Sequence, residues 1–156
     1  MSSKISPFLW FDNQAEQAAR FYVSVFTGAG RDAKILNVWP GPGGIPMGVS
    51  FEIAGTEIKA LNGGPKFTFT EAISFFVDCE TQDEVDYYWT KLSDGGYQDR
   101  CGWLKDKFGL SWQIVPSALG RMMGDKDPAK ASRAMQAMLG MRKLDIAALQ
   151  TAYDGK

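Results

Sequence analysis

The chain has 156 residues, a length that suits one domain, and 45% of them are hydrophobic, which is enough for a packed core. Its formal net charge is −1 and its basic residues are scattered, so nucleic acid and anionic membranes are not expected as partners. The chain contains no histidine, which excludes Ser-His-Asp and Cys-His nucleophile systems, His-based zinc sites and histidine acid–base catalysis.

The sequence also bears on where the protein resides. No apolar stretch approaches the ~20 residues that cross a bilayer, and the segment MSSKISPFLWF does not have the pattern of a signal peptide. The two cysteines, Cys79 and Cys101, do not make a disulfide framework. We therefore expect a cytoplasmic protein whose thiols are reduced.

The first half of the chain predicts a strand, a helix and three further strands. Residues 5–11 form an apolar run that is typical of a buried strand. From Asn13 to about residue 26, apolar side chains recur on one helical face, with Asn13 as the expected N-cap and Gly28 as the end. The Gly-Pro-Gly-Gly segment at 41–44 has the composition of a hairpin loop. The three strands are expected at residues 33–39, 47–54 and 57–62.

The second half repeats this order after a boundary segment at residues 63–70. Thr81 and Glu84 form a capping-box pattern that opens a helix extending to about Ser93. After Pro116 the strand signal disappears, and two or three short helices are expected, one of them capped at Asp127. The strands of this half are expected at residues 72–78, 101–105 and 110–115.

Five methionines lie in this C-terminal segment, and they allow two interpretations. They either fill the core as flexible side chains or form an adaptable contact with another subunit. The five are Met122, Met123, Met135, Met138 and Met141.

A shift of 66 residues aligns the two halves, which indicates an internal repeat. The repeat predicts an α+β fold of two βαβββ modules in a single domain over residues 1–156. The modules are expected at about 4–62 and 69–116, followed by a helical tail at 117–156. The matched positions are Phe11-Asp12 with Val77-Asp78, Phe21-Tyr22 with Tyr87-Tyr88, Phe26 with Leu92, and Gly30 with Gly96.

Three segments carry a family resemblance: KISPFLWFDNQAEQAARFYVSVF, AISFFVDCETQDEVDYYW and CGWLKDKFGLSWQIVP. Together they resemble the PhnB-like branch of the vicinal-oxygen-chelate (glyoxalase/bleomycin-resistance) superfamily, often labelled 3-demethylubiquinone-9 3-methyltransferase. The resemblance spans nearly the whole chain. It implies two modules whose sheets curl into an open cup with a ligand on the concave face, and it implies a homodimer.

In metal-using members of the superfamily four side chains, usually His, Glu, His and Glu, hold a divalent ion. The resemblance carries these positions to Pro7, about Ala60, Ala72 and Gln113. Only Gln113 can coordinate a metal, and a lone amide cannot hold a divalent ion against water. We therefore expect neither a metal nor a cofactor.

A cup lined by aromatic residues with few polar groups is typical of small-molecule sites. We expect a metal-free protein that binds a small aromatic or planar molecule. For each candidate the alternative is a structural role: core packing for the aromatics, a satisfied amide for Asn and Gln, an inert thiol for cysteine. The candidate ligand-binding residues are Phe8, Trp10, Asn62, Cys101, Trp103, Trp112 and Gln113, with Trp39 as a further wall.

Several neighbouring positions have expected roles of their own. Glu52 is expected in solvent, and Asp12 and Asp78 are expected to cap the helices that follow them. Arg100 beside Cys101, and a helix N-terminus after Cys79, would favour reactive thiolates, although buried inert thiols are the simpler interpretation. Only YQDR separates Gly96 from Cys101, where the family has a further strand, so we expect an open edge there, or one completed by the tail or a partner subunit.

Two other functions compete with ligand binding. One is an enzyme of the same family, either a methyltransferase or a lyase or isomerase that uses carboxylates, although the sequence has no glycine-rich loop typical of a nucleotide-type fold. The other is a protein–protein module that uses the methionine-rich tail.

Overall fold

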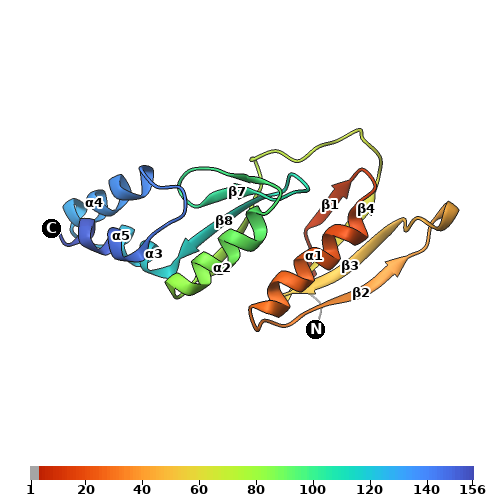
Figure 1. The fold of residues 1–156 in the computed structure, drawn as a ribbon, viewed down its shortest axis with the longest axis horizontal. Coiled ribbons are helices and arrows are strands. Elements are labelled where there is room, and N and C mark those ends of the chain that lie inside the picture. Colours follow the sequence, from red (N-terminus) through yellow and green to blue (C-terminus); the bar gives the residue numbers. More distant parts are fainter. Residues whose placement is uncertain (1–3) are drawn as a thin grey trace. The chain divides into compact units, whose positions relative to one another are not determined.

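Two units make up the chain, residues 1–69 and residues 70–156, and each is described by itself (Figure 1). The structure is a computed structural model that describes residues 4–156. Residues 1–3, which begin the predicted domain and the N-terminal segment judged not to be a signal peptide, lie outside the described residues. The division between the units falls within the segment 63–70.

Unit 1 is a four-stranded mixed sheet with one α-helix. Its strand order is β1-β4-β3-β2, with β1 parallel to β4 and the other neighbours antiparallel. The hairpin expected around residues 41–44 joins β2 to β3 and contains a short 3-10 turn, η1. The elements are β1 (Phe8–Phe11), α1 (Ala15–Gly28), β2 (Ala33–Trp39), η1 (Pro42–Gly44), β3 (Gly48–Ile53) and β4 (Thr56–Asn62).

Unit 2 repeats this plan with the strand order β5-β8-β7-β6 and adds three helices. The α+β class with two βαβββ modules is thereby confirmed. The expectation of a missing strand between Gly96 and Cys101 is wrong, because two of those residues pair with β7 as a short edge strand, β6. The elements are β5 (Phe75–Cys79), α2 (Gln82–Ser93), β6 (Tyr97–Gln98), β7 (Trp103–Lys105), β8 (Ser111–Pro116), α3 (Ser117–Met123), α4 (Pro128–Leu139) and α5 (Ile146–Tyr153).

In each unit the helix packs on one face of the sheet. Along β3, Val49 and Phe51 are fully buried, and the ring of Phe51 lies 6.1 Å from that of Tyr22 on α1. The equivalent tyrosine of α2, Tyr88, is also buried, and each tyrosine contacts the aromatic residue that precedes it. Burial of one such large apolar side chain stabilises a fold by about 1.5–3 kcal/mol. The aromatic pairs of the repeat are thus the anchors of the two helices.

The start of α1 is held differently from what the sequence predicts. Gln14, not Asn13, stands at the N-cap position, and it makes no side-chain cap. Asn62 at the end of β4 replaces the cap, because its Oδ1 accepts a hydrogen bond from the Ala15 N–H at 2.8 Å. Its Nδ2 donates to the Pro46 carbonyl at 2.9 Å. Asn62 therefore joins the helix, the hairpin and the last strand of module one.

The caps expected at Thr81 and Asp127 are confirmed, since their side chains accept hydrogen bonds from the N–H groups of Glu84 and Ala129. Those expected at Asp12 and Asp78 are wrong. Asp78 instead accepts a hydrogen bond from the Ser117 hydroxyl at the start of α3.

The three C-terminal helices pack with the end of β8 in a small apolar cluster of unit 2. Its buried members are Leu119, Met122, Ala134, Leu144 and Leu149. Met138 and Met141 pack against the cluster, whereas Met123 and Met135 are exposed. The core-filling interpretation therefore holds for three of the five methionines, and a subunit contact remains a prediction for the other two. Within residues 4–156, no helix is long and apolar enough to cross a membrane.

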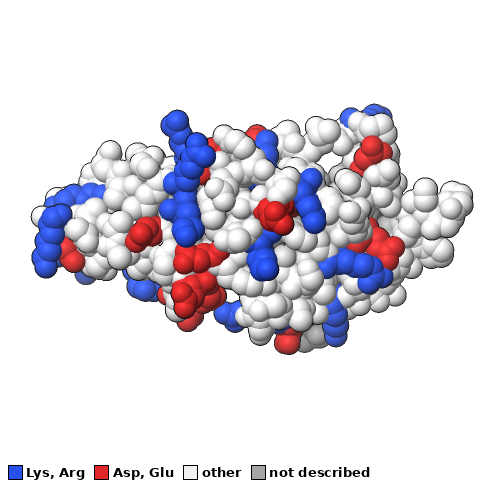
Figure 2. Space-filling model, viewed as in Figure 1, with Lys and Arg blue, Asp and Glu red and all other residues white. Residues whose placement is uncertain are grey.

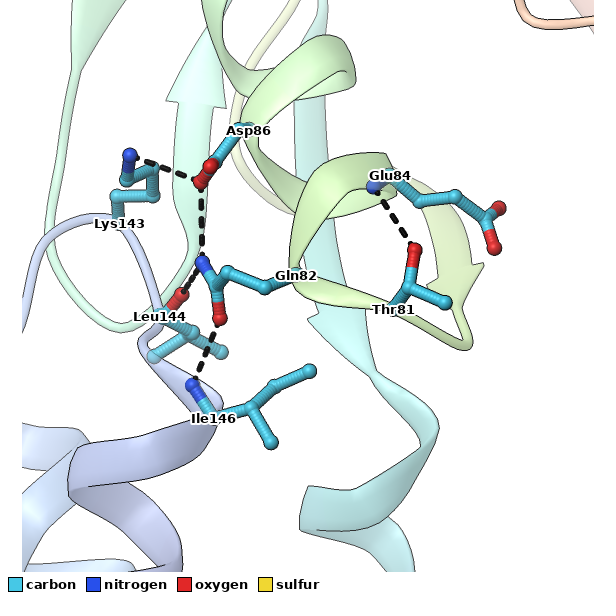
Figure 3. Close-up of polar contacts among 7 residues, drawn as sticks. All are labelled: Thr81, Gln82, Glu84, Asp86, Lys143, Leu144 and Ile146. Atoms are coloured by element: carbon cyan, nitrogen blue, oxygen red, sulfur yellow. Dashed lines mark hydrogen bonds and ion pairs between the residues drawn. The ribbon is translucent and has the colours of Figure 1, made fainter.

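Gln82, at the first position of α2, attaches the segment between α4 and α5 to the module (Figure 3). Its Nε2 donates to the Leu144 carbonyl at 3.0 Å, and its Oε1 accepts from the Ile146 N–H at 2.8 Å. Beside it, Asp86 accepts from Gln82 and forms an ion pair with Lys143 at 2.9 Å. These bonds hold Leu144 where its side chain enters the apolar cluster.

We expect Gln82→Ala to destabilise the protein by about 2 kcal/mol, because two main-chain groups of the tail lose their partner. Urea unfolding followed by circular dichroism measures the change. Gln150→Ala, which removes an exposed hydrogen bond to Asp154, is the matched control. Equal stability of the two variants would show that Gln82 does not hold the tail.

We expect Asn62→Leu to lower the free energy of unfolding by about 2 kcal/mol, because the Ala15 N–H and the Pro46 carbonyl both lose their partners. Asn62→Asp keeps the acceptor for the helix and should cost less. Asn37→Leu, a change at an exposed asparagine of β2, is the control for the same measurement. A loss no larger in Asn62→Leu than in this control would contradict the capping role.

Candidate functional site

Side chains alternate between the two faces of a strand, so the residues opposite the helix in each unit form a second, open face. In unit 1 the burial of Leu9, Phe11, Val49 and Phe51 identifies the face that α1 covers. In unit 2 the burial of Val77, Cys79, Leu104, Trp112 and Ile114 does the same for α2. The pairing registers then assign the remaining residues to the open faces.

The aromatic residues of the open face of unit 1 differ in exposure. Phe8 is 56% exposed. Trp10 is half-buried, donates from Nε1 to the Gly64 carbonyl at 2.9 Å, and meets Phe67 edge-on at 4.9 Å. A Cβ at Gly63 would lie 2.4 Å from the Trp10 ring, which shows how closely the indole covers this backbone. Trp10 therefore has a structural role at the start of the segment 63–67.

Trp39 covers the backbone of β3 in the same way, since a Cβ at its partner Gly48 would lie 2.6 Å from the indole. The next side chains along this face are charged. Glu52 lies half-buried between Lys34 and Glu57 on the neighbouring strands, so its predicted position in solvent is met only in part. The open face of unit 1 thus combines packed indoles with charged side chains.

The open face of unit 2 holds three of its side chains in one row. Phe76 on β5 pairs with Gln113 on β8, and Gln113 pairs with Trp103 on β7. Phe76 is 58% exposed, and Gln113 and Trp103 are half-buried. Side chains directly opposite one another on neighbouring strands are about 5 Å apart at Cβ. One amide therefore lies between two aromatic rings on a surface that α2 does not cover.

A polar row lies next to the aromatic one. Ser111 on β8 pairs with Lys105 on β7, and Ser74 stands one residue before the first β5–β8 pair. Gln113 Nε2 donates to the Ser74 hydroxyl at 3.0 Å, so the amide is oriented by this second row. The hydroxyl of Ser111 is buried and has no hydrogen-bond partner within residues 4–156. Tyr97, 57% exposed, continues the row onto β6.

Lys105 forms an ion pair with Glu71 in the turn before β5. The hydrogen bond from Lys105 holds the pKa of the Glu71 carboxyl below its ordinary value. Because the group lies at the surface, this shift reflects a screened interaction.

The structure removes Trp112 from the predicted site. Trp112 is 1% exposed, packs edge-on against Phe75 at 5.2 Å, and faces α2 with Ile114. Its Nε1 donates to Asp106 Oδ2 at 2.9 Å. The other oxygen of this buried carboxylate accepts from the N–H groups of Phe108 and Leu110, which closes the turn between β7 and β8. Trp112 is therefore a core residue.

Asn62 and Cys101 also lie away from the open faces. Asn62 pairs with Phe11, on the α1 side of β1, and both ends of its amide are satisfied. Cys101 is a free thiol in the turn between β6 and β7, where its backbone has a φ of 59° and its N–H donates to the Met141 carbonyl. Cys79 is buried at the end of β5, where its thiol donates a hydrogen bond to the Val77 carbonyl at 3.8 Å.

The positions carried over from metal-using relatives do not fit a metal. Ala60 is fully buried on the α1 face, Pro7 precedes β1, and Ala72 lies in the exposed turn before β5. Only Gln113 stands on an open face. Among residues 4–156, no three or more Cys, Asp or Glu side chains gather closely enough to hold an ion. No chemistry that depends on a metal is assigned to the chain.

Sequence reasoning missed five residues of the open face of unit 2. They are exposed or polar side chains, and the register of the strands decides on which face each of them lies. Only Phe76 had a signal in the sequence, because side chains alternate along a strand and its neighbour Val77 is apolar. The turn residue Glu71 carries no local signal. The five are Glu71, Ser74, Phe76, Lys105 and Ser111.

Basic and acidic side chains are interspersed on the face drawn in Figure 2, without an extended patch of one sign. A shallow hollow at the end of α2 is formed without aromatic residues, and Ser93 in it is already bonded to Gln98 and Trp89. The aromatic and polar rows of unit 2 remain the best candidate site.

Comparisons with known proteins place the chain in a family. The family model described as 3-demethylubiquinone-9 3-methyltransferase matches residues 3–115. A PhnB protein from Bacillus cereus is 31% identical, with a TM-score of 0.67 over 74% of this chain and 100% of its own. No curated protein matches the chain.

Two further solved structures are less similar in sequence. Protein PA1353 from Pseudomonas aeruginosa is 16% identical, with a TM-score of 0.60 over 74% of this chain and 98% of its own. A glyoxalase/bleomycin resistance protein from Albidiferax ferrireducens T118 is 14% identical, with a TM-score of 0.46 over 70% of this chain and 95% of its own. From its two βαβββ modules and the match over residues 3–115, the chain belongs to the 3-demethylubiquinone-9 3-methyltransferase (PhnB-like) family.

Proposed function

We propose that this protein binds a small planar molecule without a metal, on the open face of unit 2. The observation that carries the proposal is the row Phe76–Gln113–Trp103, in which an oriented amide stands between an exposed phenylalanine and a half-buried tryptophan. Aromatic walls with a few well-placed polar groups are the usual construction of small-molecule sites. We likewise propose a cytoplasmic location for this chain, whose two cysteines do not form a disulfide with each other.

The ligand gains from this surface in two ways. Covering Phe76, which is 58% exposed, removes apolar area from water, and ring stacking adds about 0.5–1.5 kcal/mol for each aromatic pair. Gln113 has its Nε2 bonded to Ser74, and its Oε1 can accept a hydrogen bond from the ligand. The rings thus supply affinity, and the amide supplies orientation.

Thermal unfolding in the presence of fused-ring aromatic compounds, 2-naphthamide among them, tests the proposal. We expect a rise in Tm that grows with compound concentration, because a ligand that binds only the folded state stabilises it. Phe76→Ala and Trp103→Ala should each reduce this rise. Phe67→Ala, which removes a similarly exposed aromatic ring from unit 1, should leave it unchanged. No stabilisation by any compound would refute the proposal.

The family description favours a second candidate, methyl transfer. A methyltransferase must bind a methyl donor, and the sequence has no glycine-rich loop typical of a nucleotide-type fold. Titration calorimetry with S-adenosylmethionine discriminates between the two functions. Heat of binding to S-adenosylmethionine would favour the enzyme, and its absence would favour the binding protein.

A further inference from the structure

The polar row of unit 2 contains a group that the fold itself leaves unsatisfied. Ser111 is 1% exposed, and its hydroxyl has no hydrogen-bond partner in the part of the chain that the structure describes. Native proteins keep few buried polar groups without a partner, because the lost hydration is not replaced. The Ser111 hydroxyl therefore keeps an unused hydrogen-bonding capacity, opposite Lys105 on the neighbouring strand.

The ion pair between Lys105 and Glu71 joins the two sides of the strand that carries Ser111. Lys105 lies on β7, Glu71 precedes β5, and β8 is the strand between β5 and β7. Lys105 is directly opposite Ser111 on β8. Because directly opposite residues have Cβ atoms about 5 Å apart, one ligand group placed here can engage both side chains.

The ion pair is easy to exchange. The side chains of Lys105 and Glu71 are 37% and 56% exposed, and such surface pairs contribute little to stability because water screens them. A carboxylate on a ligand offers Lys105 the same partner that Glu71 does. Unlike Glu71, it would also accept a hydrogen bond from Ser111.

The aromatic row supplies the second part of the proposed binding surface. Phe76 and Trp103 lie two residues along their strands from Ser74 and Lys105, a spacing of about 7 Å. A ring placed between the two aromatic side chains can therefore direct an attached carboxylate onto the polar row. A neutral ring gains only the aromatic contacts and the Gln113 amide.

We infer that unit 2 binds an aromatic carboxylate. Its ring lies between Phe76 and Trp103, and its carboxylate replaces Glu71 on Lys105. Glu71 is then an internal competitor that occupies the lysine when no ligand is bound. The inference rests on the proposed function and narrows the ligand to one chemical class.

The experiment compares 2-naphthoate with 2-naphthamide, which share a ring and differ in charge, by titration calorimetry on the full chain. We expect Lys105→Met to weaken 2-naphthoate binding about tenfold, because the carboxylate loses a charged hydrogen bond. Ser111→Ala should weaken it less, and Glu71→Gln should strengthen it severalfold. Binding of 2-naphthamide should change less than twofold in all three variants.

Asp86→Asn, which removes a negative charge from another exposed ion pair of unit 2, is the control for a general charge effect. A gain in 2-naphthoate affinity as large as that of Glu71→Gln would overturn the inference. Urea unfolding of each variant establishes that it is folded.

The outcomes separate the inference from the proposed function. If 2-naphthamide binds at the aromatic row and 2-naphthoate is insensitive to Lys105→Met and Glu71→Gln, the inference fails and the proposed function stands. If neither compound nor any other fused-ring compound binds the wild-type chain or Glu71→Gln, both fail.

Discussion

One helix can cover only one face of a four-stranded sheet, and this constraint governs both modules. In module one α1 buries Val49, Phe51 and their neighbours, and in module two α2 buries Trp112 and Ile114. The period of two along each strand then fixes which side chains are left on the other face. The candidate site depends on this division, because a shift of one residue in the pairing register would exchange the core face of a strand with its open face.

The same division explains why the modules differ. The repeat matches Phe11 with Val77, so their partners on the neighbouring strands, Asn62 and Ile114, also match. One residue before them, Leu61 corresponds to Gln113. Two residues further back, Lys59 corresponds to Ser111. Module one has an apolar residue where module two has its oriented amide. In module one the indoles of Trp39 and Trp10 cover the backbone at Gly48 and Gly63. In module two the side chain of Phe76 remains accessible. The two copies thus share a core pattern and diverge on their open faces.

The sequence predicts those features of the fold that are local. The strand at residues 33–39 and the Thr81 cap follow from alternation and from a capping pattern within four residues, and both are confirmed. Asn13 was wrong as a cap because the acceptor comes from Asn62, a residue brought to α1 by the β1–β4 pairing. The strand β6 was missed because two residues are too short to show a period.

The candidate site is harder to predict for the same reason. Trp103 and Gln113 were selected as an aromatic and an amide in apolar strands, but only the antiparallel register makes them neighbours. Trp112, like Trp103, is a tryptophan in an apolar strand, but it lies in the core. It stands one residue from Gln113 and therefore points to the opposite face of the sheet. Ser111 gives no signal in the sequence, because a serine becomes informative only when the structure leaves its buried hydroxyl unpaired. Chemistry on a sheet is therefore decided by pairing register, which residue type alone cannot supply.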